Sequence, residues 1–123
     1  MIGKVYLSVV DFYDVKLNAT NRKVRPVLII GGPNENDYTV LPISTITNRA
    51  NVNAYYDILV SPQDRTILNL KRECFIRTHK QMQIHVAALI RELADMKKDL
   101  PDLYLETIGK MDEFQHEIVK YSI

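Results

Sequence analysis

The sequence predicts an α+β fold, in which a small twisted antiparallel sheet or partly open β-barrel is followed by helices. Two patterns support this. Over the first two-thirds of the chain, short runs of β-branched and aromatic residues alternate with polar turns, as strands do. From about Ile84 onward, apolar residues recur at intervals of three and four, as on a helix. No change in composition divides the chain, so residues 1–123 are predicted to form a single domain.

The first strands are expected near the N-terminus. Residues 5–10 are mainly β-branched and aromatic, and residues 14–23 are polar and predict a loop. Residues 26–30 form a continuous apolar run that is too short for a helix and ends at two glycines. Such a run predicts a strand that is buried on both faces of the sheet.

A hairpin is expected next, with its turn at residues 34–37 and its returning strand at residues 38–43. Pro42 has no backbone N–H, which places it at a sheet edge or a strand end. The remaining elements before the helices are a polar loop over 44–54, a strand over 55–60, a helical turn capped by Ser61 and a strand over 73–79.

Two helices are predicted in the last third of the chain. The first begins near Ile84 and ends at two lysines, and Pro101 begins the second, with Asp99 as its cap. The apolar stripe of the first helix comprises Val86, Leu89, Ile90, Leu93 and Met96, and that of the second comprises Leu105, Ile108, Met111, Phe114, Ile118 and Tyr121. The second helix is expected to pack against the strands.

Charge is unevenly distributed along a nearly neutral chain. The net charge is +1, but residues 1–80 carry 11 Lys and Arg against seven Asp and Glu. Residues 15–34 hold four cations and no acid. This local excess suggests an anionic partner such as phosphate, and a solvated loop is the alternative. The apolar runs are far shorter than the roughly 20 residues of a membrane span, and no charged leader precedes one, so we expect a soluble cytoplasmic protein without a membrane partner.

Several kinds of catalytic site find no support in the sequence. No cluster of metal-ligand residues and no cofactor motif is present, and a single cysteine, Cys74, allows no disulfide within the chain. Cys74 falls within a predicted strand and is expected to be a core residue. His79 and His85 offer an acid/base pair for phosphoryl chemistry, and histidines without a role are the alternative.

One arginine and two hydroxyls are predicted to meet at one end of the sheet. Arg25 directly precedes the buried strand, and Ser44 and Thr45 follow the neighbouring strand. If these strands form a hairpin, counting back from the turn pairs residue 25 with about residue 45. A guanidinium binds phosphate through two hydrogen bonds, so this end of the sheet is a candidate phosphate site.

Short motifs in this order resemble one known family. They are Gly3-x-Val5-Tyr6-Leu7, Arg25-Pro26-Val27-Leu28-Ile29-Ile30, Pro42-Ile43-Ser44/Thr45, Ile76-Arg77-Thr78 and a C-terminal helix, and together they resemble the MazF/PemK toxins of bacterial type II toxin–antitoxin systems. The resemblance implies a small SH3-like barrel of the CcdB/PemK type that forms a homodimer. It also implies metal-independent cleavage of single-stranded RNA by 2′-hydroxyl attack, and inhibition by a cognate antitoxin.

The resemblance also implies roles for individual residues. Arg25 would stabilise charge on the phosphate or act as an acid, and Ser44 and Thr45 would bind and orient the phosphate. Arg72 lies where some members have an arginine followed two residues later by aspartate. Here that later position is Cys74, so a carboxylate base is absent or displaced to Glu73.

RNA contacts are expected from residues of the loops and strand ends beside this site, although each could instead be a solvated surface residue. They are Lys16, Arg22, Lys23, Asn48, Arg49, Asn51, Arg72, Arg77 and His79. Two other functions stay open from the sequence. One is a catalytically silent barrel that binds nucleic acid or protein, and the other is a gyrase-poisoning toxin of the same fold.

Overall fold

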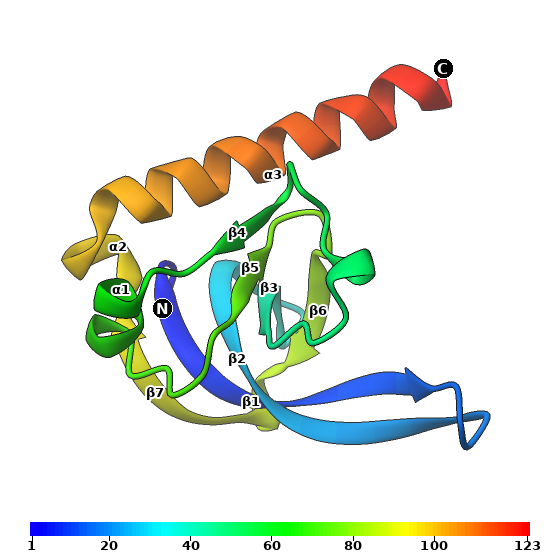
Figure 1. Ribbon diagram of the computed structural model, residues 1–123, viewed down its shortest axis with the longest axis horizontal. Coiled ribbons are helices and arrows are strands. Elements are labelled where there is room, and N and C mark those ends of the chain that lie inside the picture. The colour runs from blue at the N-terminus through cyan, green and yellow to red at the C-terminus, as the bar shows by residue number, and fades with distance from the viewer.

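The computed structural model describes residues 1–123 as an α+β fold, in which one antiparallel sheet curls into a half-barrel and a long C-terminal helix lies across it (Figure 1). The strands are β1 (Lys4–Asp14), β2 (Ala19–Asn34), β3 (Asp37–Ser44), β4 (Asp57–Leu59), β5 (Phe75–Arg77), β6 (Met82–His85) and β7 (Leu89–Asp95). The helices are α1 (Pro62–Ile67), α2 (Met96–Asp99) and α3 (Pro101–Ser122), with 3-10 turns at Arg49–Asn51 and Val86–Ala88. None of the helices combines the length and apolar character needed to span a bilayer.

The strands follow the order β4-β5-β3-β2-β1-β7, and β6 also pairs with β3. Strand β3 is therefore central, so Pro42 does not lie at a sheet edge. It lies two residues before the end of β3, which agrees with the alternative expectation of a strand end. Strand β3 pairs with β6 up to Val40 and with β5 from Ile43 onward. Pro42 lies where β3 changes partner, so its missing N–H interrupts neither ladder.

The apolar run of β2 is buried on both faces, as predicted. Leu28 packs in a cluster with Leu41, Ile43 and Met96 on one face, whereas Val27 and Ile29 pack in a second cluster on the other face. The predicted hairpin is confirmed as well, because β2 and β3 pair antiparallel across a turn at residues 35–36.

Only residues 15–18 of the loop predicted over 14–23 form a turn, and the others belong to β1 and β2. Strands β1 and β2 continue past the body as a two-stranded arm, paired from Val10↔Lys23 to Asp14↔Ala19 (Figure 1). Cross-strand contacts hold this polar segment extended. Arg22 pairs with Asp11 at 3.3 Å, and the Lys23 ammonium lies 4.2 Å from the centre of the Phe12 ring. Such side-chain pairs stabilise a ladder even where few apolar residues are buried.

The helix predicted from about Ile84 to the two lysines, Lys97 and Lys98, is wrong over most of its length, because the segment forms β6, a 3-10 turn and β7. Only its end, from Met96 onward, is helical, as α2. Strand β7 pairs with β1, and the register shifts at Val5/Tyr6 and at Leu7/Ser8. Such shifts disturb the two-residue alternation of a regular strand. Leu89 and Leu93 consequently join different core clusters although they are four residues apart, a spacing that suggests one helix face.

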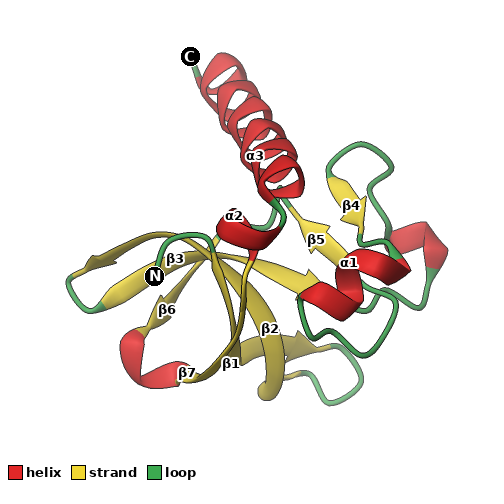
Figure 2. Cartoon of the chain, turned by 90° about the vertical axis from the view of Figure 1, so that its left-hand side faces the viewer, coloured by secondary structure: helices red, strands yellow, loops and turns green.

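The second predicted helix is confirmed as α3, with changes at both ends. Its N-terminal half packs on the sheet through Leu103, Tyr104, Ile108 and Met111. The C-terminal end extends away from the sheet (Figure 2), so Ile118 and Tyr121 of the predicted stripe are exposed, and Leu105 also faces outward. Asp99 does not cap α3, which begins after Leu100 without a side-chain cap. The predicted Ser61 cap of α1 is confirmed, since the Ser61 hydroxyl accepts a bond from the Asp64 amide.

Candidate functional site

Two clefts meet at Arg25. The first, which we call the basic cleft, has a volume of about 790 Å³, and its polar lining includes Lys23, Arg25, Thr45, Thr47, Asn69, Lys71, Arg72 and Arg91. Five of its lining side chains are cationic and none is a carboxylate. The second, the histidine cleft, has a volume of about 720 Å³ and is lined by Arg25 with Asp11, Phe12, Tyr13, Ser44, Arg77, His79, Lys80, Gln81 and three apolar residues.

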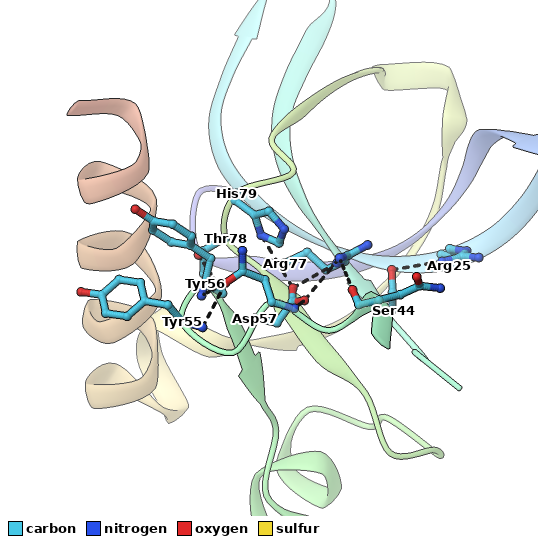
Figure 3. A network of polar contacts seen from close by, with 10 residues as sticks. Arg25, Ser44, Tyr55, Tyr56, Asp57, Arg77, Thr78 and His79 are labelled. Atoms are coloured by element: carbon cyan, nitrogen blue, oxygen red, sulfur yellow. Dashed lines mark hydrogen bonds and ion pairs between the residues drawn. The ribbon is translucent and has the colours of Figure 1, made fainter. Parts of the chain in front are cut away.

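Arg25 and Ser44 meet as the sequence predicts. The β2–β3 register pairs Val27 with Pro42, which carries Arg25 to a position opposite Ser44. The Arg25 Nη1 donates a hydrogen bond of 3.0 Å to the Ser44 Oγ (Figure 3), and the Ser44 side chain is buried. The guanidinium therefore has a fixed partner on the neighbouring strand, while its other N–H groups are free for an anion.

Thr45 lies on the other side of this strand end. Side chains alternate between the faces of a strand, so Ser44 lines the histidine cleft, whereas the exposed Thr45 lines the basic cleft. The two predicted hydroxyls therefore do not share one cleft. Arg25 is the residue that reaches both.

A buried carboxylate lies behind the histidine cleft. The Asp57 side chain is fully buried, and its two oxygens accept bonds from the Arg77 Nε at 3.0 Å and the Arg77 Nη2 at 3.3 Å. The backbone N–H of Asn53 donates a further bond of 2.8 Å to the same carboxylate. The Nδ1 of His79 lies 3.7 Å from the Asp57 Oδ1 (Figure 3). Asp57 thus holds Arg77 in place and faces the imidazole.

Aromatic rings hold His79 on its other sides. The Tyr56 ring stacks on the imidazole with centres 5.9 Å apart, and the Phe114 ring of α3 meets it edge-on at the same separation. Burial lowers the pKa of His79 below its ordinary value, although the Asp57 charge acts in the opposite direction. The Tyr56 hydroxyl donates to the Glu117 carboxylate at 2.8 Å; this bond, together with burial, raises the pKa of Tyr56 to about 12.

Cys74 is a core residue, as predicted, and borders the basic cleft. Burial raises the pKa of its thiol to about 11, so the sulfur stays protonated at neutral pH. Glu73, the alternative base, forms an exposed ion pair with Arg49 at 3.1 Å. Neither Cys74 nor Glu73 therefore places a carboxylate base in either cleft.

The predicted RNA contacts divide into three groups. Lys23 and Arg72 line the basic cleft, and Arg77 and His79 line the histidine cleft. The others line neither cleft: Lys16 and Arg22 belong to the arm, and Asn48, Arg49 and Asn51 lie at the 3-10 turn before β4. His85 does not join His79, because its exposed ring caps the turn at Val86–Ala88.

Several residues of this region were not predicted from the sequence, among them Asp57, Lys71 and Arg91. Asp57 was detectable, since a lone carboxylate within the apolar run Tyr-Tyr-Asp-Ile-Leu-Val needs a buried partner. Lys71 and Arg91 carried no comparable signal. Arg91 lies on β7, which the sequence pattern presents as a helix.

The comparisons with known proteins give no family. No protein-family model matches the chain, and no curated protein matches it significantly. No group of three or more His, Cys, Asp or Glu side chains is placed to hold a metal ion.

Proposed function

We propose that the protein is an endoribonuclease that cleaves single-stranded RNA without a metal, through attack of a ribose 2′-hydroxyl on the adjacent phosphate. The observation that carries this proposal is the position of Arg25, which is bonded to Ser44 at 3.0 Å and lines two clefts. A guanidinium fixed in this way is suited to the negative charge that develops on a phosphate during displacement.

The two clefts suit the two chemical parts of a nucleic acid strand. The basic cleft offers five cations and no carboxylate, which favours a run of phosphates. The histidine cleft carries the rings of Phe12 and Tyr13, and aromatic side chains bind unpaired bases by stacking. A strand lying in both clefts would bring one phosphate to Arg25, at their junction.

The proposed reaction is a transesterification. The 2′-oxygen loses its proton and forms a bond to phosphorus, and the bond from phosphorus to the 5′-oxygen breaks. The products are a 2′,3′-cyclic phosphate and a 5′-hydroxyl, whose proton replaces the one lost from the 2′-oxygen. Arg25 stabilises the non-bridging oxygens, and Ser44 holds the guanidinium in position.

The resemblance to MazF/PemK toxins extends this proposal to fold type and partners. The half-barrel would be an SH3-like barrel of the CcdB/PemK type, acting in the cytoplasm as a homodimer. The antitoxin would cover the site with an acidic segment. The five cations of the basic cleft support this last point, because no acid of the cleft compensates them.

One observation favours a second function, a barrel that binds without cutting. Cys74 replaces the carboxylate expected from the resemblance, and its thiol, with a pKa of about 11, is already protonated at neutral pH and cannot accept a proton. The clefts would then bind RNA, DNA or a protein partner through the same cations.

The test is incubation of a long single-stranded RNA with purified protein in EDTA. We expect wild type to cleave it and Arg25→Ala to leave it intact. Arg22→Ala is the matched control, since this arginine lies on the arm, outside both clefts. If wild type binds the RNA at micromolar concentration but leaves it intact, the binding function replaces the proposed one.

A further inference from the structure

We propose that His79 is the general base of this reaction and that Asp57 orients its imidazole. The proposal rests on the proposed function and supplies the proton acceptor that neither Cys74 nor Glu73 provides. His79 shares the histidine cleft with Arg25 and Ser44, so the base and the phosphate-binding arginine face the same space.

The first observation is an unpartnered nitrogen. The His79 Nδ1 is buried without a hydrogen-bond partner, in a side chain that is only 10% exposed. Buried polar atoms are nearly always bonded, so this nitrogen calls for an explanation. The Asp57 Oδ1 lies 3.7 Å away, slightly beyond a hydrogen bond, and Arg77 and the Asn53 amide already fix the Asp57 carboxylate.

The second observation is the orientation of the His79 ring relative to the Asp57 carboxylate. A proton on the Nδ1 faces the carboxylate, and the Nε2 then carries the free lone pair. Only the Nδ1 of His79 is buried without a partner, and the residue lines the histidine cleft, so we assign the Nε2 as the ring nitrogen that meets the substrate. Tyr56 and Phe114 fix the ring plane by stacking and edge-on contact, which holds the Nε2 in one direction.

The charged groups around His79 act in opposite directions on its pKa. Asp57 on β4 favours the imidazolium, whereas Arg77 and Lys80 beside it disfavour it. Arg25 and Asp11 line the same cleft as His79, and α3 contributes the neutral ring of Phe114. Burial is the largest influence and lowers the pKa of His79, so the imidazole is unprotonated at neutral pH, as a base must be.

The step conserves protons and electrons. The Nε2 accepts the proton of the ribose 2′-hydroxyl while the 2′-oxygen attacks phosphorus and the bond to the 5′-oxygen breaks. The 5′-oxygen takes up one proton, either from the imidazolium or from solvent. In the second case the imidazolium releases its proton to solvent, so His79 returns to its starting form by either route. Asp57 does not touch the substrate. It acts as a positioning residue by stabilising the imidazolium and fixing the tautomer.

The test compares His79→Ala, His79→Gln and Asp57→Asn with wild type, using a short RNA and steady-state kinetics in EDTA. We expect His79→Ala to lower kcat/KM by about 100-fold to 10,000-fold, the range that general base catalysis supplies. Added imidazole should restore part of the rate to His79→Ala but not to His79→Gln, because the glutamine fills the space. Asp57→Asn should lower kcat with little change in KM. The exposed His85 provides the control, His85→Ala, which should cleave as wild type does.

The pH profile separates a base from a residue that only packs. Wild-type kcat/KM should fall at acidic pH with an apparent pKa below the ordinary histidine value, and this limb should vanish in His79→Ala. If a folded His79→Ala cleaves at nearly the wild-type rate, or is inactive without rescue by imidazole, His79 is not the base and the role of Arg25 still stands. If wild type itself leaves RNA intact, the proposed function falls, and the proposal for His79 falls with it.

Discussion

Replacing Ser44 by alanine removes the acceptor that holds the Arg25 guanidinium at 3.0 Å. A hydrogen bond to a charged group contributes about 1.5–3 kcal/mol. Arg25 is partly exposed, so water replaces part of this bond, and we expect a loss at or slightly below the bottom of this range, about 1–1.5 kcal/mol. For a chain of 123 residues this corresponds to a fall in Tm of about 3–7 °C.

The effect of Ser44→Ala on cleavage should be larger than its effect on stability. Arg25 loses its fixed direction, and loss of one preorganised donor to a reacting oxyanion lowers kcat by about 100-fold to 1,000-fold. Thr45→Ala is the matched control. Thr45 is exposed and lines the other cleft, so its removal should lower kcat by less than about ten-fold.

Two assays check this account of Ser44. Single-turnover cleavage of a labelled RNA gives the rate constants of both variants. Chemical denaturation of Ser44→Ala, Arg25→Ala and the double variant gives a coupling energy of about 1 kcal/mol if the two side chains are bonded. Equal cleavage by Ser44→Ala and Thr45→Ala, or strictly additive losses of stability, would refute the reasoning.

Three further outcomes follow from the same structure. Replacing Lys71, Arg72 and Arg91 together by alanine should weaken RNA binding, because three phosphate contacts are lost. The slope of log K against log salt should then become less steep by about 2. An unchanged slope in binding titrations would place the RNA outside the basic cleft. The thiol of Cys74, with its pKa raised by burial to about 11, should react with a disulfide reagent far more slowly in native than in unfolded protein, and equal rates would contradict its burial. Gly32→Ala should lower the free energy of unfolding by about 1–3 kcal/mol. Gly32 has a φ of +95°, and an added Cβ would lie 2.7 Å from a carbonyl oxygen of β3. An unchanged denaturation midpoint would contradict this expectation.

Stability should also respond to alkaline pH through two buried groups. The pKa of Tyr56 is raised to about 12, and that of Cys74 to about 11, so both hold their protons more tightly in the folded state. Their contribution is complete below the ordinary pKa of each group and is lost as pH rises through the folded value. Denaturation midpoints should therefore fall from about pH 9 upward, more steeply in wild type than in Tyr56→Phe. Identical slopes in the two proteins would remove Tyr56 from this explanation.

The sequence predicts the parts of the fold that depend on local pattern. The doubly buried strand around Leu28, the hairpin that follows it and the Ser61 cap each depend on residues close together in the chain. The helix predicted from about Ile84 to Lys98 was wrong over most of its length, because β7 pairs with β1 through a bulged ladder in which apolar residues do not follow strict two-residue alternation. A bulge depends on the pairing register with the partner strand as well as on the segment's own residues, so it cannot be recognised from a short stretch of sequence.

Some contacts of the candidate site were likewise predictable from the sequence, and others were not. The meeting of Arg25 and Ser44 was predictable, because a hairpin turn fixes the register of the strands beside it. The contact between Asp57 and His79 was not, since it joins β4 to the residues after β5 and depends on the ring of Phe114 from α3. Tertiary packing of this kind leaves no periodic signal in the sequence.

The proposed function requires that a ribose 2′-hydroxyl of the RNA attacks the adjacent phosphate while Arg25 binds that phosphate. The most direct measurement uses an end-labelled RNA with one mapped cut, beside the same RNA carrying a single 2′-deoxy nucleotide on the 5′ side of that cut. We predict that wild type leaves a 2′,3′-cyclic phosphate and a 5′-hydroxyl on the first RNA and does not cut the second. Cleavage of the 2′-deoxy strand, or ends bearing a 3′-hydroxyl and a 5′-phosphate, would contradict the account.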